Sequence, residues 1–153
     1  TPLDRAALMQ EKNDRKAEIC AKLPPLPGVV ELIVLAEESS AKLAVASSSA
    51  ADWVHPHLER LELMDRFHAV TTGDQVKNVK PDPELYLTSA AKLGVSADKC
   101  LVLEDSLNGV KAARAAGMAV FAVPNSITGG LDFSEATRVL KSLEDISKDL
   151  SIF

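Results

Sequence analysis

Two adjacent carboxylates, Glu104 and Asp105, follow a short apolar run and directly precede a predicted helix. Residues 100–103, CLVL, form an uninterrupted apolar segment, which is typical of a strand buried on both faces of a parallel sheet. Ser106 is a residue type that caps helices, and Gly117 suits the left-handed position after a helix end. In open α/β sheets ligands bind outside the carboxyl ends of the strands, so both carboxylates lie where a ligand would bind.

The pair Glu104 and Asp105 has two interpretations. Adjacent carboxylates supply hard oxygen ligands, and Mg²⁺ is commonly held by one or two carboxylates together with water and substrate phosphate. Alternatively, both side chains only favour the positive end of the helix that follows. This stretch alone does not distinguish a metal site from a helix cap.

Two further polar groups follow other predicted strands. Ser47 comes directly after LAVA (residues 43–46), and Lys80 lies in the loop beyond HAVTT (residues 68–72). We expect these groups and the acidic pair to share one rim of the sheet. A hydroxyl and backbone N–H groups at a helix start bind phosphate oxygens, a lysine adds positive charge, and carboxylates bring Mg²⁺. Together they predict a phosphoryl-transfer site.

The elements that must position these groups alternate along the chain. Asp82 is expected to cap a helix that has Pro83 in its first turn and ends at Gly94, whereas the first helix has no convincing N-cap. The alternation predicts an α/β fold with a parallel sheet covered on both faces. The other expected helices cover residues 3–23, 29–38, 50–63, 106–117 and a last stretch near 143–150, and the strands cover 43–46, 68–72, 100–103 and 119–123.

Composition narrows the class of function. The chain has 153 residues, a formal net charge of −5 and no run of basic residues, which favours small-molecule chemistry over nucleic-acid binding. It shows no bilayer-length apolar stretch and no signal-peptide pattern, so we expect no membrane partner and a cytoplasmic location. Cys20 and Cys100 are expected to be reduced thiols. His55 and His57 lack a carboxylate cluster at ligand spacing, so we interpret them as solvated.

Three runs, LAVASSS, KPDPELYL and LVLEDSLNGVKAARAAGM, resemble in order and spacing the second, third and fourth motifs of the haloacid dehalogenase (HAD) superfamily. More narrowly, they resemble its phosphatase and β-phosphoglucomutase-like branch, and PLPGVVELI resembles the return from the helical cap into the core. The resemblance implies a Rossmann-like α/β core at residues 29–153. It also implies that residues 24–28 are a hinge and residues 1–23 the terminal helix of the cap domain.

The resemblance implies a role for each matched residue. Ser47 resembles the residue whose hydroxyl binds the transferring phosphoryl group, assisted by the backbone of Ser48. Lys80 resembles the lysine that bridges the phosphate and the nucleophile. Glu104 and Asp105 resemble the acidic pair that binds Mg²⁺ directly or through water.

The family's nucleophile has no match. In this family an Asp of a DxDGT-like motif on the first, central strand attacks phosphorus, and a second Asp two residues later acts as general acid and base. No DxD occurs in the 153 residues, so we expect the nucleophile, the central strand and most of the cap to be missing. Because strands 43–46 and 100–103 normally flank that strand, we expect two unpaired apolar edges. Another segment of the protein, a separate chain or a swapped partner would fill the gap between them; otherwise the region should be poorly stable or associate with itself. Ser106 and Asn108 either support the acidic loop or only cap the helix.

The resemblance therefore implies a Mg²⁺-dependent phosphatase that acts on a small phosphorylated metabolite, such as a sugar phosphate, through an aspartyl phosphate. One alternative is a β-phosphoglucomutase-like phosphosugar mutase. Another is an inactive fragment that only binds or interacts. The enzyme would be the parent protein, and this chain without its nucleophile is expected to be inactive.

Overall fold

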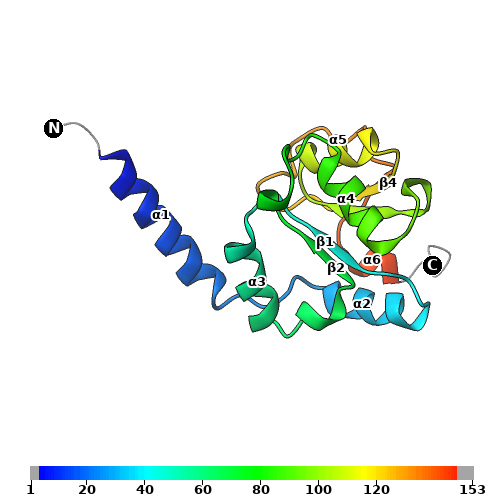
Figure 1. The fold of residues 1–153 in the computed structure, drawn as a ribbon, viewed down its shortest axis with the longest axis horizontal. Coiled ribbons are helices and arrows are strands. Elements are labelled where there is room, and N and C mark those ends of the chain that lie inside the picture. Colours follow the sequence, from blue (N-terminus) through cyan, green and yellow to red (C-terminus); the bar gives the residue numbers. More distant parts are fainter. Residues whose placement is uncertain (1–3, 148–153) are drawn as a thin grey trace.

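The computed structural model describes residues 4–147 and shows an α/β body from which one long helix extends (Figure 1). This helix, α1 (Arg5–Cys20), has no buried residue. The carboxylate of Asp4 caps it by accepting hydrogen bonds from the backbone N–H groups of Ala6 and Ala7 at 3.0 and 3.1 Å. The expectation that α1 has no good cap is wrong, because a carboxylate one residue before the first turn satisfies its free N–H groups.

The order of elements agrees with the alternation predicted from sequence, with shifts of a few residues at their ends. The short strand β5 was not predicted, and the part of the last predicted helix beyond residue 147 lies outside the described residues. After α1 come α2 (Val29–Glu38), β1 (Ala44–Ala46), α3 (Ala51–Arg60), β2 (Ala69–Thr71), α4 (Glu84–Leu93), β3 (Leu101–Glu104), α5 (Leu107–Ala115), β4 (Ala119–Ala122), β5 (Arg138–Val139) and α6 (Glu144–Ser147).

The strands form two parallel sheets within residues 4–147, one of β1 and β2 and one in the order β3-β4-β5. Here β1 pairs with β2 alone and β3 with β4 alone, so each keeps one edge that no described strand covers. This agrees with the expectation of two unpaired strand edges. The predicted parallel arrangement is confirmed, with the strands divided between two sheets.

A shared core nevertheless joins the two sheets. Helix α4 packs on both β1 and β2 and also contacts α5. Tyr86 of α4 belongs to the same buried cluster as Val102 of β3 and Val120 of β4, and Ala46 at the end of β1 packs against it. The carboxyl end of β1 is therefore anchored to the core that carries the acidic strand β3.

Strand β3 is not buried on both faces, which corrects the sequence-based prediction. Its side chains alternate, with Val102 buried while Leu101 and Leu103 are 36% and 37% exposed. On β4, Phe121 pairs in register with Leu103 and is buried by Leu32 of α2 and Ile146 of α6. On this face α2 and α6 cover β4 but not β3. A continuous apolar run in the sequence does not show which strands the helices cover.

Local capping confirms most of the predicted turns. Ser106 caps α5, its Oγ accepting from the backbone N–H of Gly109 at 3.1 Å, and Gly94 and Gly117 both adopt positive φ after helix ends. At the start of α4 the prediction is one residue out. Pro83 is the N-cap, and Asp82 accepts from the backbone N–H of Glu84 at 3.0 Å.

Helix α1 and the segment that follows it contact side chains of α3. The ammonium of Lys16 lies 4.0 Å from the centroid of the Trp53 ring, and the Arg60 guanidinium donates to the carbonyl of Leu23 at 3.0 Å. The same Trp53 ring meets His57 edge-on at 4.5 Å between centroids. Across the described chain, no helix combines the length and apolar character needed to cross a membrane.

The division of the chain into a cap helix, a hinge and a core remains a prediction.

Candidate active site

Glu104 ends β3 and lies at the centre of a hydrogen-bonded cluster. Its Oε1 accepts from Lys80 Nζ and from Tyr86 Oη, and its Oε2 accepts from Ser106 Oγ at 2.9 Å. The Lys80 ammonium also lies 4.7 Å from the centroid of the Tyr86 ring. The side chains of Lys80 and Glu104 are only 13% and 7% exposed, so this is a largely buried ion pair. The structure thus brings together Lys80 and Glu104, as predicted.

Electrostatics keep Glu104 ionised despite its burial. Burial by itself raises the pKa of Glu104, but the charge of Lys80 and the hydrogen bonds from Lys80, Tyr86 and Ser106 together hold that pKa below its usual value. Burial raises the pKa of Tyr86 far above its usual value, and the negative charge of Glu104 adds to this. Tyr86 therefore remains a protonated donor.

Tyr86 is a site residue that sequence reasoning missed. It lies 18 residues from Glu104 in the chain, and only the buried core that α4 shares with β3 brings its hydroxyl to the carboxylate. The available signal was its place in KPDPELYL, six residues after Lys80. A tyrosine inside an otherwise apolar helix face is usually buried with a partner for its hydroxyl.

Gly109 in the first turn of α5 is required by the Glu104 carboxylate. A Cβ at residue 109 would lie 1.9 Å from Glu104 Cδ and 2.0 Å from its Oε2. Glu104 cannot swing aside without losing the donors that surround it. The space at residue 109 is therefore too small for any side chain larger than that of glycine.

We expect Gly109→Ala to lower the free energy of unfolding by about 1–2 kcal/mol, because the overpacking penalty exceeds the helix propensity gained with alanine. Urea unfolding followed by circular dichroism measures the change. Gly130→Ala is the matched control, since a Cβ there meets nothing within 4 Å. An unfolding midpoint for Gly109→Ala at or above that of the unmodified protein would contradict the requirement.

Asp105 differs from Glu104 in its surroundings. Its side chain is exposed, and Oδ2 accepts a hydrogen bond from Asn125 Nδ2 at 2.9 Å. Asn125 follows β4, and sequence reasoning did not single it out. Asn108, which was predicted either to support this loop or to cap the helix, is exposed and makes no side-chain hydrogen bond to the described residues.

Ser47 stands at the end of β1 in a tightly held loop. Its backbone N–H donates to the carbonyl of Thr71 on β2 at 2.9 Å, and its Oγ accepts from the N–H of Ser49 at 3.1 Å. Gly73 supports the loop from the side: its N–H donates to the Ser49 carbonyl at 2.8 Å, and a Cβ there would lie 2.3 Å from the carbonyl oxygen of Ser48. The Ser47 hydroxyl proton remains free to donate to an anion.

The predicted site residues therefore fall into two groups in the described chain. Lys80 and Glu104 are in contact, and Asp105 follows Glu104 directly. Ser47, with the exposed Ser48, lies on a separate loop that makes no hydrogen bond to Lys80 or to either carboxylate. Their connection is indirect, through the packing of Ala46 against the cluster that includes Tyr86.

The donor set fits Mg²⁺ rather than a metal enclosed by protein ligands. Among residues 4–147 no group of three or more His, Cys, Asp or Glu side chains could hold a metal ion. Mg²⁺ does not need such a group, because it keeps several waters and takes substrate phosphate oxygens beside one or two carboxylates. Glu104 and Asp105 supply two such carboxylates.

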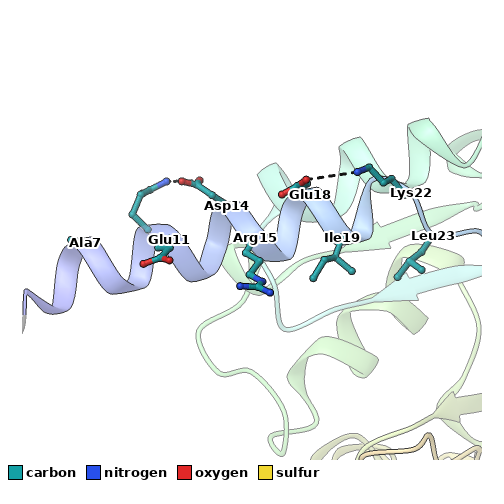
Figure 2. A pocket seen from close by; sticks show the side chains of 9 residues that line it. Ala7, Glu11, Asp14, Arg15, Glu18, Ile19, Lys22 and Leu23 are labelled. Atoms are coloured by element: carbon teal, nitrogen blue, oxygen red, sulfur yellow. Dashed lines mark hydrogen bonds and ion pairs between the residues drawn. The ribbon is translucent and has the colours of Figure 1, made fainter.

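A shallow hollow elsewhere on the molecule does not compete as a site. Figure 2 shows it along α1, where side chains such as Glu11, Arg15 and Ile19 line it. All of its lining residues come from α1 and the turn after it, and none of the predicted site residues is among them. It is the open surface of one exposed helix.

Comparison with known proteins identifies the family. Residues 3–123 match the family described as haloacid dehalogenase-like hydrolase. The chain belongs to this family. The HAD-like assignment agrees with the resemblance seen in the three sequence runs, and it places Ser47, Lys80, Glu104 and Asp105 within the matched region.

Individual HAD-like relatives support the phosphatase branch. The phosphorylated carbohydrates phosphatase of Thermotoga maritima is 38% identical over 83% of this chain and 59% of its own length. The β-phosphoglucomutase of Bacillus subtilis is 33% identical over 98% of this chain and 65% of its own length. Among solved structures, CbbY from Rhodobacter sphaeroides in complex with phosphate is similar with a TM-score of 0.79 and 30% identity, over 95% of this chain and 67% of that one.

The chain spans about half to two thirds of the length of the curated relatives it matches. The fold and the family are therefore those of HAD-like hydrolases. Activity and substrate belong to the whole protein.

Proposed function

We propose that this HAD-like chain is part of a Mg²⁺-dependent phosphatase that hydrolyses a small phosphorylated metabolite, with a sugar phosphate as the substrate class. The observation that carries the proposal is the buried Lys80–Glu104 pair beside the exposed Asp105 carboxylate at the end of β3. Burying a lysine and a carboxylate costs free energy even when the two are paired. A phosphoryl-transfer site would use both charges. The relatives above include a phosphatase of phosphorylated carbohydrates, which supports the substrate class.

In the proposed reaction the residues of this chain bind and neutralise the phosphoryl group. The Ser47 hydroxyl and the Ser48 backbone donate hydrogen bonds to its oxygens, and protons of the Lys80 ammonium not used by Glu104 do the same. Glu104 and Asp105 would hold Mg²⁺, which supplies positive charge against the phosphoryl oxygens. The attacking carboxylate, which forms the aspartyl phosphate, comes from a DxD segment outside the 153 residues.

The test is phosphate release from a panel of sugar phosphates, measured for this chain alone and for the chain joined to a DxD-bearing segment of a HAD-like relative. We expect release only from the joined protein and only with Mg²⁺. Equal release by the chain alone would show that the nucleophile lies within it. A folded joined protein without any release would favour the non-catalytic alternative.

A β-phosphoglucomutase-like mutase is the second candidate, because the Bacillus subtilis β-phosphoglucomutase matches 98% of this chain. The two functions differ in where the phosphoryl group goes. ³¹P NMR of the joined protein with a hexose phosphate separates them, since a phosphatase accumulates free phosphate whereas a mutase accumulates an isomeric hexose phosphate. The cytoplasmic location stays a prediction.

We also propose that this 153-residue chain, without a DxD-bearing strand, associates with itself through the uncovered edges of β1 and β3. Leu101 and Leu103 expose apolar surface beside the free edge of β3, and such edges pair readily with another chain. Sedimentation velocity over a concentration series should show oligomers at micromolar concentration, and Leu103→Lys should shift the distribution towards monomer. Leu8→Lys on α1 is the matched control at an exposed leucine. A monomer at every concentration would contradict the proposal.

A further inference from the structure

The two carboxylates at the end of β3 are held in different ways. Glu104 takes donors on both oxygens, from Lys80, Tyr86 and Ser106. Asp105 takes one hydrogen bond within residues 4–147, from Asn125 to Oδ2, and its side chain faces solvent. Its Oδ1 accepts no hydrogen bond within the described residues and is therefore the least occupied carboxylate oxygen of the pair.

Asn125 is itself fixed by a compact turn after β4. Its Oδ1 accepts from the backbone N–H groups of Ile127 and Thr128 at 2.8 and 3.1 Å, and its own N–H donates to Thr128 Oγ1 at 3.0 Å. Its carbonyl accepts from the N–H of Gly129 at 2.8 Å. Because two backbone donors occupy the side-chain oxygen, the amide nitrogen is turned outward to Asp105.

We propose that Asn125 is a positioning residue for Asp105. By holding Oδ2, it orders the carboxylate and leaves Oδ1 to bind the cation of the proposed site. Partners of this kind, which hold a ligand without touching the metal, restrict its orientation and strengthen metal binding. The inference rests on the proposed Mg²⁺ site and adds to it the residue that orients its exposed ligand.

Three variants separate this role from a purely structural one. Asn125→Ser keeps a short oxygen that can accept from the turn N–H groups but has no donor long enough to reach Asp105. Thr128→Ala disturbs the same turn, by removing the acceptor for the Asn125 N–H, and leaves the amide in place. Asp105→Asn removes the charge of the proposed ligand itself.

Mn²⁺ titration of the protein, followed by electron paramagnetic resonance of the free ion, measures affinity independently of catalysis. We expect Asn125→Ser to weaken Mn²⁺ binding by about 10-fold. Thr128→Ala should leave the affinity nearly unchanged, and Asp105→Asn should weaken binding far more than Asn125→Ser does. Thermal unfolding of the two turn variants should be similar, so that a difference in affinity between them is not a difference in stability.

Each outcome decides a different claim. If Asn125→Ser binds Mn²⁺ as tightly as the unmodified protein, the positioning role is overturned while the metal site stands. If Thr128→Ala weakens binding as much as Asn125→Ser, the turn and not the amide is responsible, which also overturns the role. If Asp105→Asn has no effect, the metal is not at Asp105, and both the proposed site and this inference fail.

Discussion

Replacing Asp105 by Ala is expected to lower Mg²⁺-dependent phosphate release by about 100-fold in the protein supplied with its DxD segment. The charge that Mg²⁺ places against the phosphoryl oxygens is worth several kcal/mol in the transition state, and loss of about 3 kcal/mol corresponds to about two powers of ten in rate. Asp105 is the exposed carboxylate of the pair. The helix that follows it, α5, does not depend on its side chain, because Ser106 is the N-cap. We therefore expect the fold to survive the change.

The measurement is the rate of phosphate release as a function of Mg²⁺ concentration. Part of the lost activity should return at high Mg²⁺, because Glu104 and the substrate phosphate remain as ligands. Asp98→Ala is the matched control, since Asp98 is an exposed carboxylate in the turn before β3. Unchanged activity of Asp105→Ala at limiting Mg²⁺ would remove Asp105 from the metal site.

Replacing Lys80 by Met is expected to lower the free energy of unfolding by about 3 kcal/mol near pH 7, because it leaves the buried Glu104 charge without its cation. The methionine keeps the apolar stem of the lysine, so the loss reports the charge and its hydrogen bond. Adding Glu104→Gln to Lys80→Met should recover much of the loss, since the double variant buries no charge. Lys111→Met, at an exposed lysine on α5, is the control for the loss of a positive charge.

The Lys80–Glu104 pair predicts that the free energy of unfolding depends on pH with opposite signs in the unmodified protein and in Lys80→Met. In the unmodified protein the pKa of Glu104 lies below its usual value, so its ionisation stabilises the fold above that usual value, about 4.3. This contribution is lost as pH falls through the folded-state pKa. In Lys80→Met the two largest effects that lower the pKa of Glu104, the charge and the hydrogen bond of Lys80, are removed, and only the weaker hydrogen bonds from Tyr86 and Ser106 still oppose burial. The pKa of Glu104 should therefore rise, so that lowering the pH protonates Glu104 and restores stability.

Urea unfolding at neutral and acidic pH, without divalent cations, measures this dependence. The difference in unfolding free energy between the two proteins should be largest near neutral pH and should shrink on acidification. A difference that stays constant with pH would mean that Lys80 contributes packing rather than charge neutralisation.

The alternation of helices and strands could be predicted from the residues because it depends on local patterns. Apolar runs such as CLVL, capping residues such as Ser106, and Gly94 or Gly117 after helix ends each act on their nearest neighbours in the chain. The candidate residues Lys80 and Glu104 were found in the same way, from their places after strands and from the resemblance of their motifs. Their contact followed, because strand ends in such folds share one rim.

Other features depended on tertiary packing, since they join residues that are distant in the chain. Tyr86 reaches Glu104 only because α4 and β3 share a core, and Asn125 reaches Asp105 only because β4 lies beside β3. The exposure of Leu103 depends on where the cover of α2 and α6 stops on the sheet. The amino-acid sequence by itself determined which groups are available for phosphoryl chemistry. Tertiary structure decided which of them are buried and paired and which face solvent, because burial and hydrogen bonding are properties of the packed chain.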